Sequence, residues 1–114
     1  MNKRSNKTLK KKQKQKQISF KEIHYKSNDG MLTTVWGPPM WHYLHTMSFN
    51  YPVKPTKRDK KNYRNVILNL QNTLPCGKCR ENLKSNFEKL PITMKTMKNR
   101  ETFSQYIFDL HELI

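Results

Sequence analysis

Residues 74–87 read LPCGKCRENLKSNF. Their sulfur-bearing and apolar side chains recur at the spacing of one helical face: Cys76, Cys79, Leu83 and Phe87. Pro75 stands where a proline can open a helix, because the first helical N–H groups need no partner within the helix. The pattern predicts a helix that starts at Cys76 and is closed by Pro91, with both cysteines on or near the side that packs inward.

Three further segments have the same helical period. The proline pair at 38–39 suits a first helical turn, so we expect a helix over Pro39–Asn50. Another should follow Asp59 as N-cap and end near Thr73, and a last one should follow Asn99 as N-cap. Their apolar faces comprise Met40, Trp41, Tyr43, Leu44 and Met47; Tyr63, Val66, Ile67, Leu70 and Leu74; and Phe103, Tyr106, Ile107, Leu110, His111 and Ile114.

The predicted fold class is therefore all-α, a small four-helix bundle. No segment alternates polar and apolar residues as a strand would, which argues against a thioredoxin fold despite the CxxC.

Positive charge is concentrated at the N-terminus. The chain has 114 residues and a formal net charge of +15, and residues 1–17 hold eight Lys or Arg and no acidic residue. Such a block repels itself and cannot bury enough apolar surface to offset its ordering entropy. We expect a disordered basic tail over 1–17, a linker over 18–34 with a turn at Asn28-Asp29-Gly30, and one folded domain over 35–114.

The tail has two open interpretations. It can bind nucleic acid through phosphate contacts, or it can serve as a solubilising extension. Subtracting its +8 from +15 leaves +7 for residues 18–114, so the folded part is basic as well.

The chain shows no targeting segment. No stretch approaches the ~20 apolar residues of a membrane span, and the tail lacks the apolar region of a signal peptide. We therefore expect a cytoplasmic protein. Structural disulfides are uncommon in that compartment, which favours a catalytic role for the CxxC.

Cys76 and Cys79 are the only cysteines of the chain. A helix start lowers the pKa of a cysteine, and Lys78 and Arg80 beside the pair act in the same direction. Thiol redox chemistry is the first hypothesis. Three alternatives stay open: half of a zinc site, which lacks two further ligands at a suitable spacing; a Cys–His hydrolase, which lacks an evident oxyanion hole; and a structural bridge, which so short a loop would stabilise little. We predict no metal site.

Two helices carry histidines among apolar positions. Trp41 and His45 lie one turn apart, and His111 lies on the last helix. A single such histidine is usually a satisfied core residue. Together with an inward CxxC, these three rings could wall a flat aromatic cofactor.

The order and spacing of four motifs resemble the Erv/ALR sulfhydryl oxidases, most of all the compact forms of large cytoplasmic DNA viruses. The motifs are WGPPMWHYLHT at 36–46, Asn50-Tyr51-Pro52, Leu74–Cys79 and His111. The resemblance covers about 35–114. It implies an FAD-dependent thiol oxidase that forms disulfide bonds in substrate proteins and passes the electrons through flavin to O2, giving H2O2.

The resemblance also implies roles for particular residues. Cys76 would exchange with substrate thiols, and Cys79 would react with the flavin. The residues implied to bind FAD are Gly37, Trp41, His45, Leu74, Cys79, His111 and Ile114. A short fifth helix would follow Ile114, so we expect the chain to be part of a longer protein.

The implied partners are thiol-containing protein substrates or a thioredoxin-like carrier, and a second copy in a homodimer that would involve Tyr43 or Met47. The implied location is the host cytoplasm, a virus factory or the virion. A function of another class remains as the alternative: a basic nucleic-acid-binding or scaffold module with an incidental CxxC.

Overall fold

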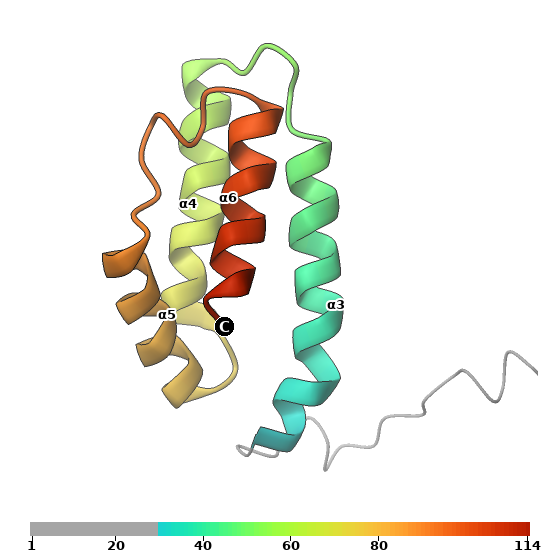
Figure 1. Ribbon diagram of the computed structural model, residues 1–114, viewed down its shortest axis with the longest axis vertical. Coiled ribbons are helices and arrows are strands. Elements are labelled where there is room, and N and C mark those ends of the chain that lie inside the picture. The colour runs from blue at the N-terminus through green and yellow to red at the C-terminus, as the bar shows by residue number, and fades with distance from the viewer. Residues whose placement is uncertain (1–29) are drawn as a thin grey trace, which may run out of the picture.

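The chain folds as a bundle of helices. The structure is a computed structural model that describes residues 30–114. This part of the chain contains α3 (Gly30–Phe49), α4 (Lys57–Thr73), α5 (Gly77–Lys89) and α6 (Arg100–Glu112), and no strand (Figure 1). The predicted all-α four-helix bundle is confirmed. The tail predicted over 1–17 and most of the linker predicted over 18–34 lie outside the described residues.

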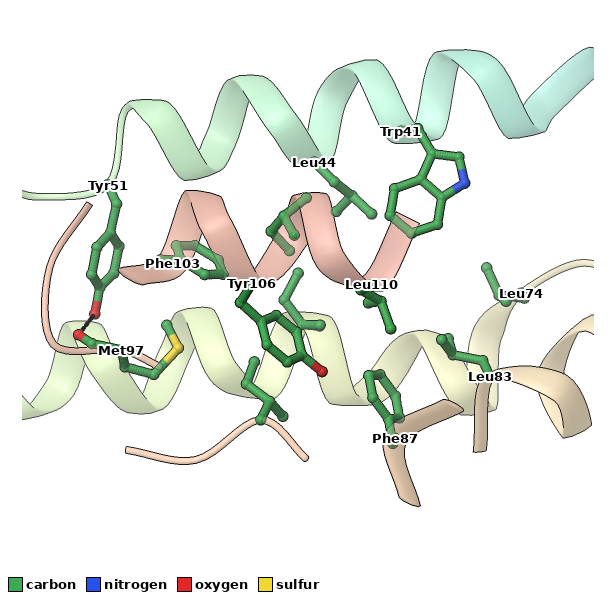
Figure 2. Packing of buried hydrophobic residues seen from close by; sticks show 13 residues of the cluster. Trp41, Leu44, Tyr51, Leu74, Leu83, Phe87, Met97, Phe103, Tyr106 and Leu110 are labelled. Atoms are coloured by element: carbon green, nitrogen blue, oxygen red, sulfur yellow. Dashed lines mark hydrogen bonds between the residues drawn. The ribbon is translucent and has the colours of Figure 1, made fainter. Parts of the chain in front are cut away.

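The helices pack as two close pairs. α3 lies beside α6, and α4 lies beside α5. The last helix, α6, lies between α3 and α4 in both views (Figures 1 and 2). At one end of the bundle the hydroxyl of Tyr51 donates to the carbonyl of Met97 at 2.8 Å, and Arg64 Nε donates to the carbonyl of Ile92 at 2.8 Å. These bonds fasten the two long connections to each other and to α4.

All four helices contribute to one hydrophobic core (Figure 2). Its buried members are Trp41, Leu44, Tyr51, Ile67, Leu74, Leu83, Phe87, Ile92, Met97, Phe103, Tyr106, Ile107 and Leu110. The ring of Tyr51 meets those of Tyr63 and Phe103 edge-on at centroid distances of 4.9 and 5.0 Å. The other end of the core, at Trp41, Leu74 and Leu83, adjoins the CxxC.

The start predicted for the first helix is wrong. α3 begins at Gly30, so Gly30–Thr34 of the predicted linker are helical and Pro38 and Pro39 lie inside the helix. Local signals favour a start at the prolines, because a proline removes one helical hydrogen bond and crowds the preceding turn. Tertiary packing outweighs that cost here: Trp36, before the prolines, packs on the core, and helical stability comes mainly from such packing.

The helix caps agree only in part with prediction. Asn99 caps α6 as predicted, but α4 is capped by Thr56. Asp59 occupies the third position of α4, where its carboxylate accepts from the N–H of Thr56 at 2.9 Å while the Thr56 hydroxyl accepts from the N–H of Asp59 at 3.0 Å. This capping box satisfies two N–H groups at once, which a lone Asp59 cap would not do.

Four residues assigned to apolar faces are exposed instead. His111 is exposed, and Ile114 is 70% exposed and lies beyond the end of α6. The other two lie within helices. Tyr43 is 63% exposed and Val66 is 46% exposed. The buried positions of α3 are Trp41, Leu44 and Ser48, at intervals of three and four residues, and Tyr43 falls outside that row. The side chains of Tyr43 and Val66 are therefore available to solvent or to a partner.

Within residues 30–114, no helix combines the length and the apolar character that crossing a bilayer requires.

Candidate functional site

The two cysteines lie at the junction between α4 and α5. Cys76 has an extended backbone (φ −120°, ψ 126°) and is the N-cap of α5. Its Sγ accepts a hydrogen bond from the N–H of Cys79 at 3.2 Å, in the place that an oxygen takes in an ordinary cap. Both cysteines are free thiols in this structure. The Pro75–Cys76 segment thus aims one sulfur at the exposed N–H groups of the helix start.

The surroundings separate the acidities of the two thiols. The hydrogen bond from the Cys79 thiol, followed by the bond from the Cys79 N–H, lowers the pKa of Cys76. Burial, followed by the hydrogen bond with Cys76, raises the pKa of Cys79. The lowered pKa of Cys76 has the direction predicted for a cysteine at a helix start, but its largest cause is the Cys79 thiol, and the helix N–H groups come second. In the reduced pair, Cys76 is the sulfur that loses its proton first.

The expectation that both sulfurs face the core is wrong for Cys76. Cys79 packs against the hydrophobic core, but Cys76 is not part of it. The reason is the extended conformation of Cys76, which takes its side chain off the helical row of Cys79, Leu83 and Phe87. Only Cys79 is therefore packed against the core, although both cysteines are half-buried.

Cys79 opens on a small cavity of about 190 Å³. Its lining comes from α3, α5 and the ends of α4 and α6: Thr33, Trp36, Gly37, Met40, Trp41, Leu74, Cys79, Asn82, Leu83, Asn86 and Ile114. A shallower hollow of about 460 Å³ adjoins it, lined by Thr33, Gly37, Pro38, Trp41, His42, His45 and His111. The two share Thr33, Gly37 and Trp41, so they form one continuous recess along α3, which we call the α3 recess.

Three rings form one wall of the α3 recess. The rings of Trp41 and His111 stack, with centroids 4.2 Å apart and planes within 2°. His45 Nε2 and His111 Nδ1 lie 3.0 Å apart and share a hydrogen bond, for which one ring must donate and the other accept. Burial, followed by the neighbouring His111 and His42, lowers the pKa of His45. His111 was expected to face inward; it is exposed on its outer side and is held by its stack on Trp41.

Every residue that the sequence marked for the cofactor borders the α3 recess. The set comprises Gly37, Trp41, His45, Leu74, Cys79, His111 and Ile114. Cys76, by contrast, lies outside the lining. No group of three His, Cys, Asp or Glu side chains in the described part of the chain is arranged to hold a metal ion.

Sequence reasoning missed several polar lining residues. Asn82 and Asn86 follow Cys79 by three and seven residues on α5 and share its face. Their spacing from Cys79 could have predicted that both line the site. The sequence held no comparable signal for Thr33, because this residue lies in the stretch predicted as a linker.

The fold and the site define a class of protein. The family model described as the Erv1 / Alr family matches residues 38–114, a stretch that includes both cysteines, most of the α3 recess and three complete helices. The chain belongs to this family.

Relatives with known names include viral and plant proteins. The chain is 33% identical over 79 residues to a probable FAD-linked sulfhydryl oxidase, R368, of Acanthamoeba polyphaga mimivirus, covering 69% of this chain and 55% of the relative. It is 33% identical over 76 residues to the FAD-linked sulfhydryl oxidase of African swine fever virus, covering 67% and 61%. For FAD-linked sulfhydryl oxidase ERV1 of Arabidopsis thaliana the figures are 30% over 78 residues, 68% and 39%. The chain thus spans about two fifths to three fifths of these relatives.

Proposed function

We propose that the protein is an FAD-dependent thiol oxidase that forms disulfide bonds in substrate proteins. The observation that carries this proposal is the position of Cys79: its thiol borders a recess walled by aromatic rings, while its partner Cys76 lies outside that recess. The names of the viral and plant relatives support the same activity.

The residues of the α3 recess fit a flavin nucleotide. The Nε1 atom of Trp36 is buried and has no hydrogen-bond partner among the described residues, although Trp36 lines the cavity beside Cys79. An unpaired buried N–H is costly, and a flavin carries carbonyl and ring-nitrogen acceptors for such a donor. Gly37 borders both parts of the recess, and a Cβ added there would meet only Thr33 Cγ2 at 3.8 Å, so the missing side chain leaves room for a ligand.

We assign the binding of FAD to Gly37, Trp41, His45, Leu74, Cys79, His111 and Ile114. Bound FAD would accept two electrons from the reduced cysteine pair and deliver them to O2, which becomes H2O2. The protein's own part is to present the two thiols in order. Cys76, the more acidic sulfur and the one outside the recess, exchanges with substrate thiols, and Cys79 connects that exchange to the recess.

The test combines colour with oxygen consumption. The purified full chain is expected to be yellow, or to become yellow with added FAD, and to consume O2 with dithiothreitol. Cys76→Ser and Cys79→Ser should abolish consumption while leaving FAD bound. A wild-type protein that stays colourless after reconstitution, or serine variants that keep full activity, would refute the proposal.

We further propose thiol-containing proteins or a thioredoxin-like carrier as the partners that supply electrons, and a homodimer as the assembly. The exposed Tyr43 on α3 is consistent with such an interface, and Met47, which is half-buried on the same helix, would lie near it. For a viral protein of this kind, the host cytoplasm, a virus factory or the virion is the expected place of action. Sedimentation of wild type and Tyr43→Glu tests the dimer, since a buried charge at the interface should yield monomers.

The net charge of +15 supports a second candidate function, a basic nucleic-acid-binding or scaffold module. It predicts steeply salt-dependent binding to DNA or RNA that survives Cys79→Ser and is lost when residues 1–17 are deleted. Fluorescence anisotropy over a salt series measures both effects. Binding that is unaffected by the deletion would show that residues 1–17 are not the nucleic-acid-binding segment.

A further inference from the structure

Arg80 reaches back across the CxxC from the first turn of α5. Its backbone N–H bonds the carbonyl of Cys76 at 3.0 Å, while its guanidinium Nη1 donates to the carbonyl of Leu74 at 2.5 Å. The side chain thus folds toward the N-terminal end of α5, over Gly77. A Cβ at Gly77 would lie 3.5 Å from Arg80 Nη2, so the guanidinium rests directly against this glycine. Arg80 therefore spans the loop that carries Cys76.

Arg80 lies between two helix ends of opposite partial charge, the start of α5 and the end of α4. The helix dipole places partial positive charge at the start of α5, where cations are disfavoured. The first turn of α5 holds no acidic residue, and no carboxylate of the described residues pairs with Arg80. Its acceptor is the carbonyl of Leu74, the C-cap of α4, where the helix dipole favours a cation. Cys76 lies in the loop between Leu74 and Gly77 that Arg80 spans, and its sulfur is the group of that loop that can gain a full negative charge.

The two redox states differ in that charge. In the disulfide, Cys76 Sγ is neutral, and Arg80 has only the two helix ends and the Leu74 carbonyl around it. In the reduced pair, Cys76 can ionise, and its thiolate then lies near both the guanidinium and the helix start. The positive charge of Arg80 is among the causes that lower the pKa of Cys76, after the hydrogen bonds from Cys79. The arginine is thus better accommodated when the pair is reduced.

We propose that Arg80 is a positioning residue for thiol–disulfide exchange: it anchors the Leu74–Cys76 loop and makes the Cys76–Cys79 disulfide more oxidising by favouring the reduced, ionised pair. The inference rests on the proposed thiol-oxidase function and deepens it, because it concerns the step in which substrate electrons enter.

The substrate is oxidised in two successive thiol–disulfide exchanges. A substrate thiolate attacks Sγ of Cys76, the bond between Cys76 and Cys79 breaks, and its electron pair goes to Cys79 Sγ, which takes up a proton. The second substrate thiolate then attacks the substrate sulfur of the mixed disulfide, and Cys76 leaves as a thiolate. Two electrons pass from the substrate dithiol to the pair. Arg80 assists the second displacement, because a thiol that is more stable as a thiolate leaves faster.

The test is the equilibrium between the full-length protein and a dithiothreitol redox buffer at pH 7, read by alkylation of the free thiols. Arg80→Gln should shift this equilibrium about tenfold toward the protein disulfide, which corresponds to a potential lower by about 30 mV. Lys78→Gln is the matched control. It removes the same charge two residues away, but the Lys78 side chain is exposed and only the backbone N–H of Lys78 acts on Cys76. Its equilibrium should stay within about twofold of wild type.

Arg80→Lys separates charge from anchoring. It keeps the cation but loses the planar fork that reaches Leu74, so its equilibrium should lie closer to wild type than that of Arg80→Gln. Circular dichroism tests whether each variant is folded. If Arg80→Gln does not fold, the equilibrium of Arg80→Lys is compared with that of wild type instead. Equal potentials for Arg80→Gln, Lys78→Gln and wild type would overturn the proposal.

The equilibrium involves only the cysteine pair, and its outcome is separate from that of the proposed function. A protein that shows the Arg80 effect but binds no FAD would contradict the oxidase and leave Arg80 as a determinant of the cysteine potential. If the protein is yellow and consumes oxygen, but the potential of its cysteine pair is the same in wild type and Arg80→Gln, this inference alone is contradicted.

Discussion

The two cysteines of one motif have different environments because only one of them belongs to the helix proper. Cys76 is extended and accepts the cap hydrogen bond, which stabilises its negative charge. Cys79 is partly buried against the core, which disfavours charge. The CxxC spacing alone predicted the redox chemistry and the helix start, and the family resemblance implied the roles of the two sulfurs. The structure adds a physical difference between them, the contact of Cys79 with the core.

Alkylation should distinguish the two thiols. In the fully reduced protein at pH 7, a limiting amount of iodoacetamide is expected to label Cys76 well before Cys79, because the lowered pKa of Cys76 leaves more of it as thiolate. Mass spectrometry of peptides locates the label. Urea-unfolded protein serves as the control, in which the two rates should converge. Preferential labelling of Cys79 in the folded protein would contradict the assignment.

His45 should make stability depend on pH. Burial lowers its pKa from the usual 6.5, so the unfolded chain binds a proton at His45 more readily than the folded chain does. Stability is therefore unaffected well above pH 6.5 and falls as the pH drops through that value toward the folded-state pKa. The melting temperature is expected to fall more between pH 7.5 and 5.5 in wild type than in His45→Asn. Parallel decreases in the two proteins would assign the effect to other groups.

Among the elements, helix ends were less predictable than helix existence. Asn99 is a cap because its side-chain oxygen accepts a hydrogen bond from the N–H of Thr102 at 2.9 Å. The local sequence predicts this bond, since Asn is a favoured N-cap residue. At α4, Thr56 and Asp59 are both good capping residues, and only the reciprocal geometry decides which of them caps. At α3, packing of Trp36 extends the helix through a proline pair, against the local preference.

The capping box of α4 can be tested directly. Thr56→Ala should lower the free energy of unfolding by about 1 kcal/mol, because the N–H of Asp59 loses its acceptor. Thr56→Ser keeps the hydroxyl and should retain most of the stability. Urea denaturation followed by circular dichroism measures both. If the serine variant lost as much as the alanine variant, the methyl group rather than the hydroxyl would be responsible.

At the scale of the whole molecule, α6 joins the core to the α3 recess. Leu110 is 1% exposed in the core, and the next residue, His111, stacks on Trp41 in the recess. The same turn of α6 thus fixes both packing and site. A change in the core at this turn should affect ligand binding as well as stability.

Two neighbouring substitutions compare core and surface. Leu110→Ala should cost about 2–5 kcal/mol of unfolding free energy, because it leaves a cavity in the core. Phe108→Ala, at a side chain that is 52% exposed, should cost far less. Urea midpoints with equal slopes report the difference. Similar losses for the two variants would mean that Phe108 is covered in solution, as in an assembly of copies.

The sequence by itself determined the helical class and predicted the redox pair, because helical period and motif spacing are local properties of the chain. The residues expected around a flavin came from the resemblance to the Erv/ALR family. Only the tertiary structure decided the extension of α3 through Pro38, the packing of Cys79 but not Cys76 on the core, and the contacts of Trp41 and Arg80. Those features depend on contacts between side chains and backbone groups at a helix junction or far apart in the chain. Their energies exceed local preferences but are not encoded in any single segment.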